Sequence, residues 1–239
     1  MNIEEFKNQS ELLNAEMEAR MNEPLNERFI ITDGVMKPDV YFSKPIRLAW
    51  MLKEPYDEED GTGGGWSYFD MFPEGKDLYV EQFHRGHKVT WHPIIYISHS
   101  IHNNFPKWEE MEYIRDNHSM CDVVRHVAFI NSQKLPSKGQ TTTNFDDLWE
   151  SISKHADLLK RQIDLLNPNV FIFGNTIGLY QKITGLDFRN SENHGTCRFI
   201  EQDGKLYISA YHPSQRSVSR SNYVNDIISV IEIWSSNLK

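Results

Sequence analysis

The chain has 239 residues, which is enough for one sizeable α/β domain or two small ones. Hydrophobic residues make up 39% and charged residues 25%, ordinary values for a globular protein that exclude a disordered chain. No apolar run approaches the roughly 20 residues of a membrane-spanning helix, and residues 1–20 are acidic, unlike a secretory signal. We therefore expect a cytoplasmic protein that does not enter a membrane.

The net charge of −9 is unevenly distributed along the chain. Residues 1–28 carry seven Glu against Lys7, Arg20 and Arg28, a net charge of −4, and residues 54–60 add −5 without any base. These two segments account for the whole net charge, so the remaining residues carry equal numbers of positive and negative charges. Because a phosphate backbone needs local Lys and Arg, a nucleic-acid partner requires that such residues cluster near the functional site.

The first half of the chain predicts an N-terminal helix, one buried strand and two further helices. Residues 3–21 place apolar side chains on one helical face. Ile46–Leu52 is apolar on both faces, as expected for a buried parallel strand, and a long loop rich in Gly, Asp and aromatic residues follows from 53 to about 77. Residues 91–103 and 107–118 then predict helices.

The second half predicts three more strands separated by helices. Val127–Asn131 is apolar and predicts the second strand, and residues 145–166 form the clearest amphipathic helix. Val170–Phe173 predicts the third strand, and a short helix follows it. Residues 197–210 predict a hairpin whose second arm is the fourth strand, and a final helix covers about 221–237.

Apolar strands that alternate with amphipathic helices predict a three-layer α/β/α fold with a mostly parallel, four-stranded central sheet. We assign residues 29–239 to this single domain and residues 1–28 to a helical extension packed on it. Sheets of this kind bind ligands at the carboxyl ends of their strands. The residues that follow each strand are therefore the candidates for a functional site.

Polar motifs follow the predicted strands in a particular order. Residues 53–56 (KEPY) follow the first strand, Asn131 ends the second, Gly174 closes the third, and residues 211–214 (YHPS) follow the fourth. This order resembles the uracil-DNA glycosylase superfamily, which has an acidic-Pro-Tyr turn, an Asn and a His-Pro-Ser turn at these places. The resemblance covers about residues 30–237. It implies the fold of that superfamily and an enzyme of DNA repair that acts on a flipped base.

Breaking an N-glycosidic bond places positive charge on the sugar and negative charge on the leaving base. The resemblance implies that Glu54 stabilises the sugar and orients water, whereas a neutral His212 stabilises the base together with backbone N–H groups. It also implies that Asn131 reads the edge of an extruded pyrimidine. Four aromatic residues are close enough in sequence to stack on that base: Phe69, which we favour, and Tyr56, Trp66 and Tyr68.

Phosphate contacts are expected from small and basic side chains in the loops after the second and fourth strands. The first of these loops precedes a helix N-terminus, where an anion is stabilised. The second corresponds to the segment that the family inserts into the duplex. The predicted contacts to phosphate or DNA are Lys134, Ser137, Lys138, Ser214, Arg216 and Arg220.

Three features depart from the family pattern. Glu54 stands where the best-known members have Asp or Asn, Gln215 replaces a Pro that often follows His-Pro-Ser, and the acidic residues 57–60 would repel phosphates. We expect a monomeric hydrolase that needs no metal or cofactor and cleaves uracil or another modified base from DNA. Two alternatives stay open: a non-catalytic module that binds a nucleic acid or nucleotide, and a hydrolase of free nucleosides or nucleotides.

Each candidate residue also has a structural interpretation that the sequence leaves open. Glu54 can pair with Lys53 or Arg47, and Asn131 can form a turn. The His-Pro unit can be a rigid turn with a hydrogen-bonded imidazole, and the two arginines that follow it can cap the last helix.

Overall fold

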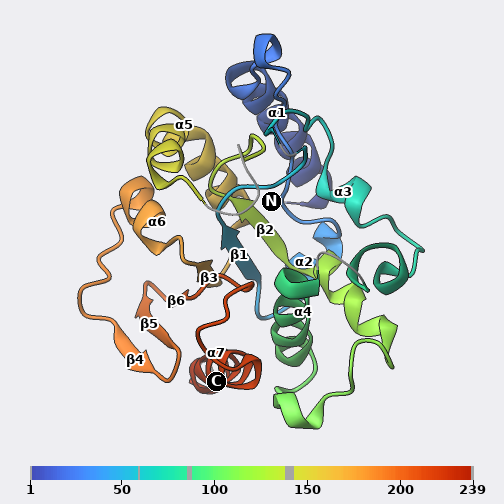
Figure 1. Cartoon of the computed structure of the whole chain (residues 1–239). Coiled ribbons are helices and arrows are strands. Elements are labelled where there is room, and N and C mark those ends of the chain that lie inside the picture. Colours follow the sequence, from blue (N-terminus) through green and yellow to red (C-terminus); the bar gives the residue numbers. More distant parts are fainter. Residues whose placement is uncertain (1, 59, 85–87, 138–142, 238–239) are drawn as a thin grey trace.

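The computed structural model describes residues 2–58, 60–84, 88–137 and 143–237. It is an α/β protein in which a six-stranded mixed sheet lies between two layers of helices (Figure 1). Within the part of the chain that the structure describes, no helix has both the length and the apolar character that crossing a bilayer requires.

The strand order is β2-β1-β3-β6-β5-β4. Four neighbouring strands are parallel: β2 (Ala128–Asn131), β1 (Leu48–Leu52), β3 (Val170–Gly174) and β6 (Lys205–Ala210). Two antiparallel strands extend one edge: β5 (Cys197–Gln202) and β4 (Glu192–His194). The prediction of a four-stranded sheet is therefore wrong, because the first arm of the hairpin joins the sheet and a short polar strand pairs with it.

Side chains of β1 alternate between two cores, and all five of its residues are buried. Leu48, Trp50 and Leu52 belong to one core and Ala49 and Met51 to the other, as the period of two in a strand requires. The first core is covered by α4 (Lys88–His102), α7 (Arg220–Ser236) and the 3₁₀ segment His118–His126. The second is covered by α2 (Pro38–Ser43), α5 (Phe145–Leu166) and α6 (Ile177–Thr184) (Figure 1).

The N-terminal helix α1 (Ile3–Met21) packs against α5. Its buried Leu13, Met17 and Met21 share a small core with Leu158 of α5. An ion pair between Arg20 and Asp157, with nitrogen and oxygen 2.6 Å apart, lies at the same contact. The 3₁₀ turn Pro24–Asn26 then leads the chain toward the sheet.

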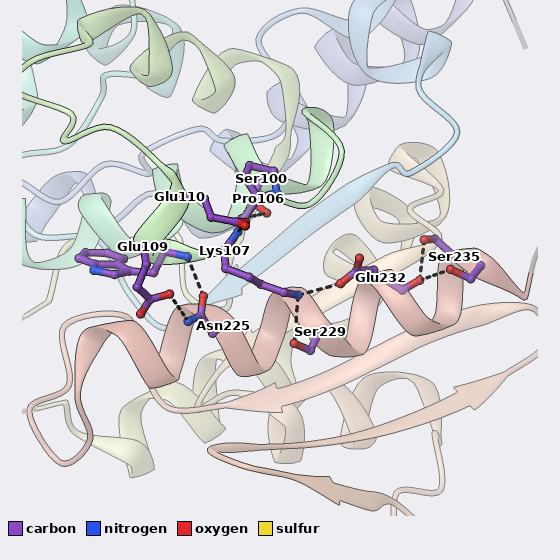
Figure 2. A network of polar contacts seen from close by, with 11 residues as sticks. Ser100, Pro106, Lys107, Glu109, Glu110, Asn225, Ser229, Glu232 and Ser235 are labelled. Carbon is purple, nitrogen blue, oxygen red and sulfur yellow. Dashed lines mark hydrogen bonds and ion pairs between the residues drawn. The ribbon is translucent and has the colours of Figure 1, made fainter.

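The helix predicted over residues 107–118 does not form. A 3₁₀ turn, Trp108–Glu110, is the regular structure in that range before His118. The side chain of Asn225 accepts the backbone N–H of Trp108 and donates to Glu109, while Lys107 donates to Ser229 and Glu232 (Figure 2). Contacts with α7 thus fix residues 107–109, and tertiary structure overrides helix propensity here.

The glycine-rich segment after β1 is hydrogen-bonded to the segment that precedes the sheet. The carbonyl of Gly63 accepts the N–H of Phe29, and the N–H of Gly65 donates to the carbonyl of Ile30. Between them, Gly64 has a φ of +84°, and a Cβ at this position would overlap the carbonyl oxygen of Phe29. Only glycine allows the two backbones to approach this closely. Short helical turns follow at α3 (Tyr68–Met71) and Tyr79–Phe83.

We predict that Gly64→Ala destabilises the protein more than Gly75→Ala does. Both glycines have positive φ, but a Cβ on Gly75 would meet no atom within 4 Å. Gly75→Ala should therefore lower the free energy of unfolding by about 1 kcal/mol, because alanine disfavours the left-handed conformation. Gly64→Ala should lower it by at least about 1 kcal/mol more, because two backbones must also separate. Urea denaturation of both variants measures the difference, and equal midpoints would contradict the close approach.

Candidate functional site

The chains that leave β1 and β2 run side by side beyond the sheet. Ser132 donates its backbone N–H to the carbonyl of Leu52, and Gln133 donates to the carbonyl of Lys53. Further on, the N–H of Ser137 donates to the carbonyl of Pro55. These three bonds fix the turn that carries Glu54.

The ends of β3 and β6 lie against the end of β1. A Cβ on Gly174 would lie 3.1 Å from a methyl group of Leu52 and 3.2 Å from the ring of Pro213. Because Gly174 has no side chain, the His-Pro turn after β6 can approach the end of β1. The motifs at residues 53–56 and 211–214 therefore belong to one edge of the sheet.

The carboxylate of Glu54 is buried, and neither oxygen meets hydrogen-bond geometry with any described residue. Burial raises the pKa of Glu54 above its usual value of 4.5, and the nearby Thr143 hydroxyl and Lys53 ammonium oppose this rise. The Glu54 carboxylate in turn raises the pKa of Tyr56, after the larger effect of burial on that ring. Glu54 and Tyr56 are thus close neighbours, as their place in one motif predicts.

Glu54 contributes to the wall of a polar cavity of about 250 Å³. Ser137 and Gln133 line the same cavity, which extends between the C-terminal end of α1 and the first half of α5. Side chains of both charges surround it, including Arg20, Arg28, Glu23, Asp147, Glu150 and Lys154. Two of the predicted site residues line this cavity: Glu54, the predicted catalytic carboxylate, and Ser137, a predicted phosphate contact.

His155 also lines the Glu54 cavity, and the sequence analysis missed it. It is buried on α5 with a Nδ1 atom that has no partner among the described residues, and burial lowers its pKa. Its backbone leaves helical geometry, with φ −124° and ψ +20°. The signal in the sequence was a histidine close to Ile152 and Leu159 on the apolar side of an otherwise regular amphipathic helix.

His212 is held as a neutral imidazole. Burial first, and the Lys53 ammonium second, lower its pKa to about 4. Its Nδ1 lies 2.7 Å from the hydroxyl of Ser214 and accepts the Ser214 backbone N–H at 3.3 Å. Because a backbone N–H can only donate, Nδ1 is the acceptor, and the proton of the neutral ring resides on Nε2.

Lys53 links the two predicted catalytic groups electrostatically. Its ammonium lowers the pKa of both Glu54 and His212, so it lies near each of them. The Nζ atom donates to the hydroxyl of Thr143 at 3.3 Å. His212 does not itself line the Glu54 cavity, so the two groups share a neighbouring cation rather than one enclosed space.

Asn131 is almost completely buried at the end of β2. Its side-chain amide donates to the hydroxyl of Tyr68 at 3.1 Å, and its backbone N–H donates to Asp33 at 2.6 Å. The ring of Tyr68 is surrounded by Phe72, Trp91 and other aromatic rings. The structure therefore directs the Asn131 amide toward this aromatic cluster, away from the residues that line the Glu54 cavity.

Phe69 is separated from Glu54. Its exposed ring lines a different, largely apolar cavity of about 310 Å³, together with Phe6 of α1 and Leu165 of α5. The structure thus does not bring the favoured stacking residue to the predicted catalytic carboxylate. Tyr56, which is beside Glu54 and partly exposed, is the better placed of the two rings.

The predicted phosphate contacts lie in different surroundings in the folded chain, some buried and some exposed. Lys134 is 1% exposed, and its Nζ donates to Asp33 at 2.6 Å and to Gln162 at 2.8 Å, so it presents no charge at the surface. Arg216 and Arg220 are exposed after β6, and Ser214 is engaged with His212. Lys138 lies outside the described residues.

No model of a known protein family matches the chain, and no curated protein matches it in sequence. The resemblance to the uracil-DNA glycosylase superfamily therefore depends on the sequence motifs alone.

We predict that Glu54→Gln stabilises the protein, by about 1 kcal/mol near pH 8. Folding raises the pKa of this carboxyl, so ionisation of Glu54 lowers the free energy of unfolding. This loss is absent below the ordinary pKa of 4.5, where the carboxyl is protonated in both the folded and the unfolded chain. The gain from glutamine should therefore grow as the pH rises from about 4.5. Thermal or urea denaturation at several pH values measures it, with exposed Glu58→Gln as the control that should change little. A loss of stability in Glu54→Gln would mean that the carboxylate is paired after all.

Proposed function

We propose that the chain is a hydrolase of N-glycosidic bonds in nucleic acids and a divergent relative of the uracil-DNA glycosylases. One observation carries the proposal: the carboxylate of Glu54 is buried after β1, at the ligand-binding edge of the sheet, and neither of its oxygens meets hydrogen-bond geometry with a described residue. Burying a carboxylate without a partner costs stability, and groups with pKa values perturbed in this way cluster at functional sites.

Glu54 acts on water in this proposal. Because burial raises the pKa of Glu54 above its ordinary value, its carboxylate is a stronger general base than an exposed one. It takes one proton from water as the water oxygen bonds to the anomeric carbon of the sugar. The C–N bond breaks, and both of its electrons leave with the base. The proton that Glu54 took from water then passes to the base. Ionised Glu54 also stabilises the positive charge that develops on the sugar.

His212 acts on the leaving base. Since its Nδ1 is an acceptor, its Nε2–H can donate to a carbonyl oxygen of the base as negative charge accumulates there. A neutral donor suits this role because its pKa, about 4, keeps it uncharged throughout the neutral range. The positive charge of Lys53 near the same edge favours the anionic base further.

A second candidate function is hydrolysis of free nucleosides or nucleotides. Lys134 is buried in an ion pair, which removes one of the cations expected to contact a phosphate backbone. The Glu54 cavity, at about 250 Å³, is small and carries both charges on its walls. Such an enclosure fits a single nucleoside better than a stretch of duplex.

We predict that uracil-containing oligonucleotides, single- or double-stranded, acquire alkali-labile sites in the presence of the protein. Glu54→Gln should lower the rate about 10²- to 10⁴-fold through loss of the general base, and His212→Ala about 10²- to 10³-fold through loss of a donor. Glu58→Gln, an exposed carboxyl on the same loop, should retain the rate. Activity that survives both Glu54→Gln and His212→Ala would remove this mechanism, and release of base from free nucleosides alone would favour the second candidate.

The pH dependence of kcat/KM should distinguish the two groups. The rate should fall on the acid side as Glu54 becomes protonated, at a pH above the ordinary 4.5, whereas His212 gains its proton only near pH 4. The residual activity of His212→Ala should therefore keep the same acid-side inflection. If that inflection disappears in His212→Ala, the titrating group is the imidazole and the assignment of roles is wrong.

A further inference from the structure

The geometry points to a nucleobase-stacking shelf beside the proposed active site: Phe145 and Trp149, with Lys53 and Lys182 over their rings, hold a base of a single-stranded nucleic acid. The choice of nucleic acid as the ligand rests on the proposed function. The shelf lies outside the Glu54 cavity, and its two rings, Phe145 and Trp149, have no role in the proposed chemistry.

Phe145 and Trp149 are one helical turn apart at the start of α5 and therefore lie on the same face. Their side chains are 47% and 42% exposed, high values for large aromatic rings that a core would otherwise bury. Both line one surface groove of about 390 Å³ between α5 and α6. Two neighbouring rings that remain open to solvent in a groove are a stacking surface for a flat ligand.

Each of the two rings carries a cation over one face. The Nζ of Lys53 lies 4.9 Å from the ring centroid of Phe145, and the Nζ of Lys182 lies 4.1 Å from that of Trp149. Lys182 also donates to the hydroxyl of Ser153 at 2.8 Å, which holds its ammonium in place. Aromatic rings interspersed with cations match the alternation of bases and phosphates along a single strand.

The opposite wall of the groove is open at Gly178. Gly178 lines it, and a Cβ at this position would meet no atom within 4 Å. Asn175, with φ +62°, and Asp146 add polar side chains to the lining. An amide and a carboxylate suit the hydrogen-bonding edge of a base, whereas the carboxylate of Asp146 repels a phosphate placed in the groove itself.

Lys53 joins the shelf to the proposed active site, because it directly precedes Glu54 in the turn after β1 and its ammonium lies over Phe145. The same ammonium that lies over Phe145 also lowers the pKa of Glu54 and His212. A strand whose reacting nucleotide occupies the edge of the sheet can therefore place a neighbouring base on α5. Only a single strand offers the face of such a base, because bases in a duplex are already stacked.

The test is binding of a fluorescent single-stranded oligonucleotide to the full chain that carries Glu54→Gln, so that the strand is not consumed. In this background Trp149→Ala and Phe145→Ala should each weaken binding about 5- to 150-fold, the range for loss of one base–aromatic stack. Trp149→Phe should retain most of the affinity, since it keeps a ring. Ile233→Ala, another exposed apolar side chain but on α7, should bind as the parent does.

A strand of the same length without bases separates stacking from charge. It should bind more weakly than the base-bearing strand, and Trp149→Ala should not weaken its binding further. The shelf is overturned if Trp149→Ala and Phe145→Ala bind the base-bearing strand like the parent, if they weaken both strands equally, or if the parent binds neither strand. Cleavage by the unsubstituted chain tests the proposed function separately: stacking without cleavage supports the shelf alone, and cleavage that does not depend on either ring supports the proposed function alone.

Discussion

The carboxylate of Asp33 is completely buried, and three donors from different parts of the chain converge on it. The backbone N–H of Asn131 donates to one oxygen at 2.6 Å, and the Nζ of Lys134 and the amide of Gln162 donate to the other at 2.6 and 2.8 Å. A buried ion pair is stable only when further hydrogen bonds satisfy both charges, and this one meets that condition. It joins the segment before the sheet to the end of β2 and to the C-terminal part of α5. Asp33 and Gln162 line the apolar cavity that contains Phe69.

The architecture could be predicted largely from the sequence because it depends on periodicity. The helix predicted over residues 145–166 forms over that range as α5, and the strands at β1, β2 and β3 agree with the predictions to within about two residues. The errors occur where periodicity carries no information. The strand Glu192–His194 is short and polar, and the turn at Trp108–Glu110 is determined by the side chain of Asn225 on α7. The pairing of this strand with β5 and the contact of Asn225 with Trp108 both join residues that are apart in the sequence, so a local pattern does not reveal them.

The sequence positions of the candidate site residues could be predicted, but the directions of their side chains could not. A rule about the ends of parallel strands identified Glu54 and His212, and the same rule placed Lys134 and Asn131 beside them. It does not tell which way a side chain points after its strand ends. Lys134 turns inward because Asp33 is there, and Phe69 turns away because α3 begins at Tyr68, whose own ring enters the core. These are three-dimensional contacts between residues far apart in the sequence.

The acidic stretch beside Glu54 has a different meaning in the folded chain than in the sequence. Asp57 accepts the backbone N–H of Gly64 at 2.7 Å and the indole N–H of Trp66 at 3.0 Å, and Asp60 accepts the backbone N–H and hydroxyl of Thr62. These two carboxylates therefore fix the glycine-rich segment, which pairs with Arg28 and Thr32 of the segment before the sheet. Lys53 and Lys182 lie over the rings of Phe145 and Trp149 on the α5 side of the site. The carboxylates of Asp146, Asp147 and Glu150 are exposed on the same half of α5, so a strand that approaches Glu54 from that side meets both charges.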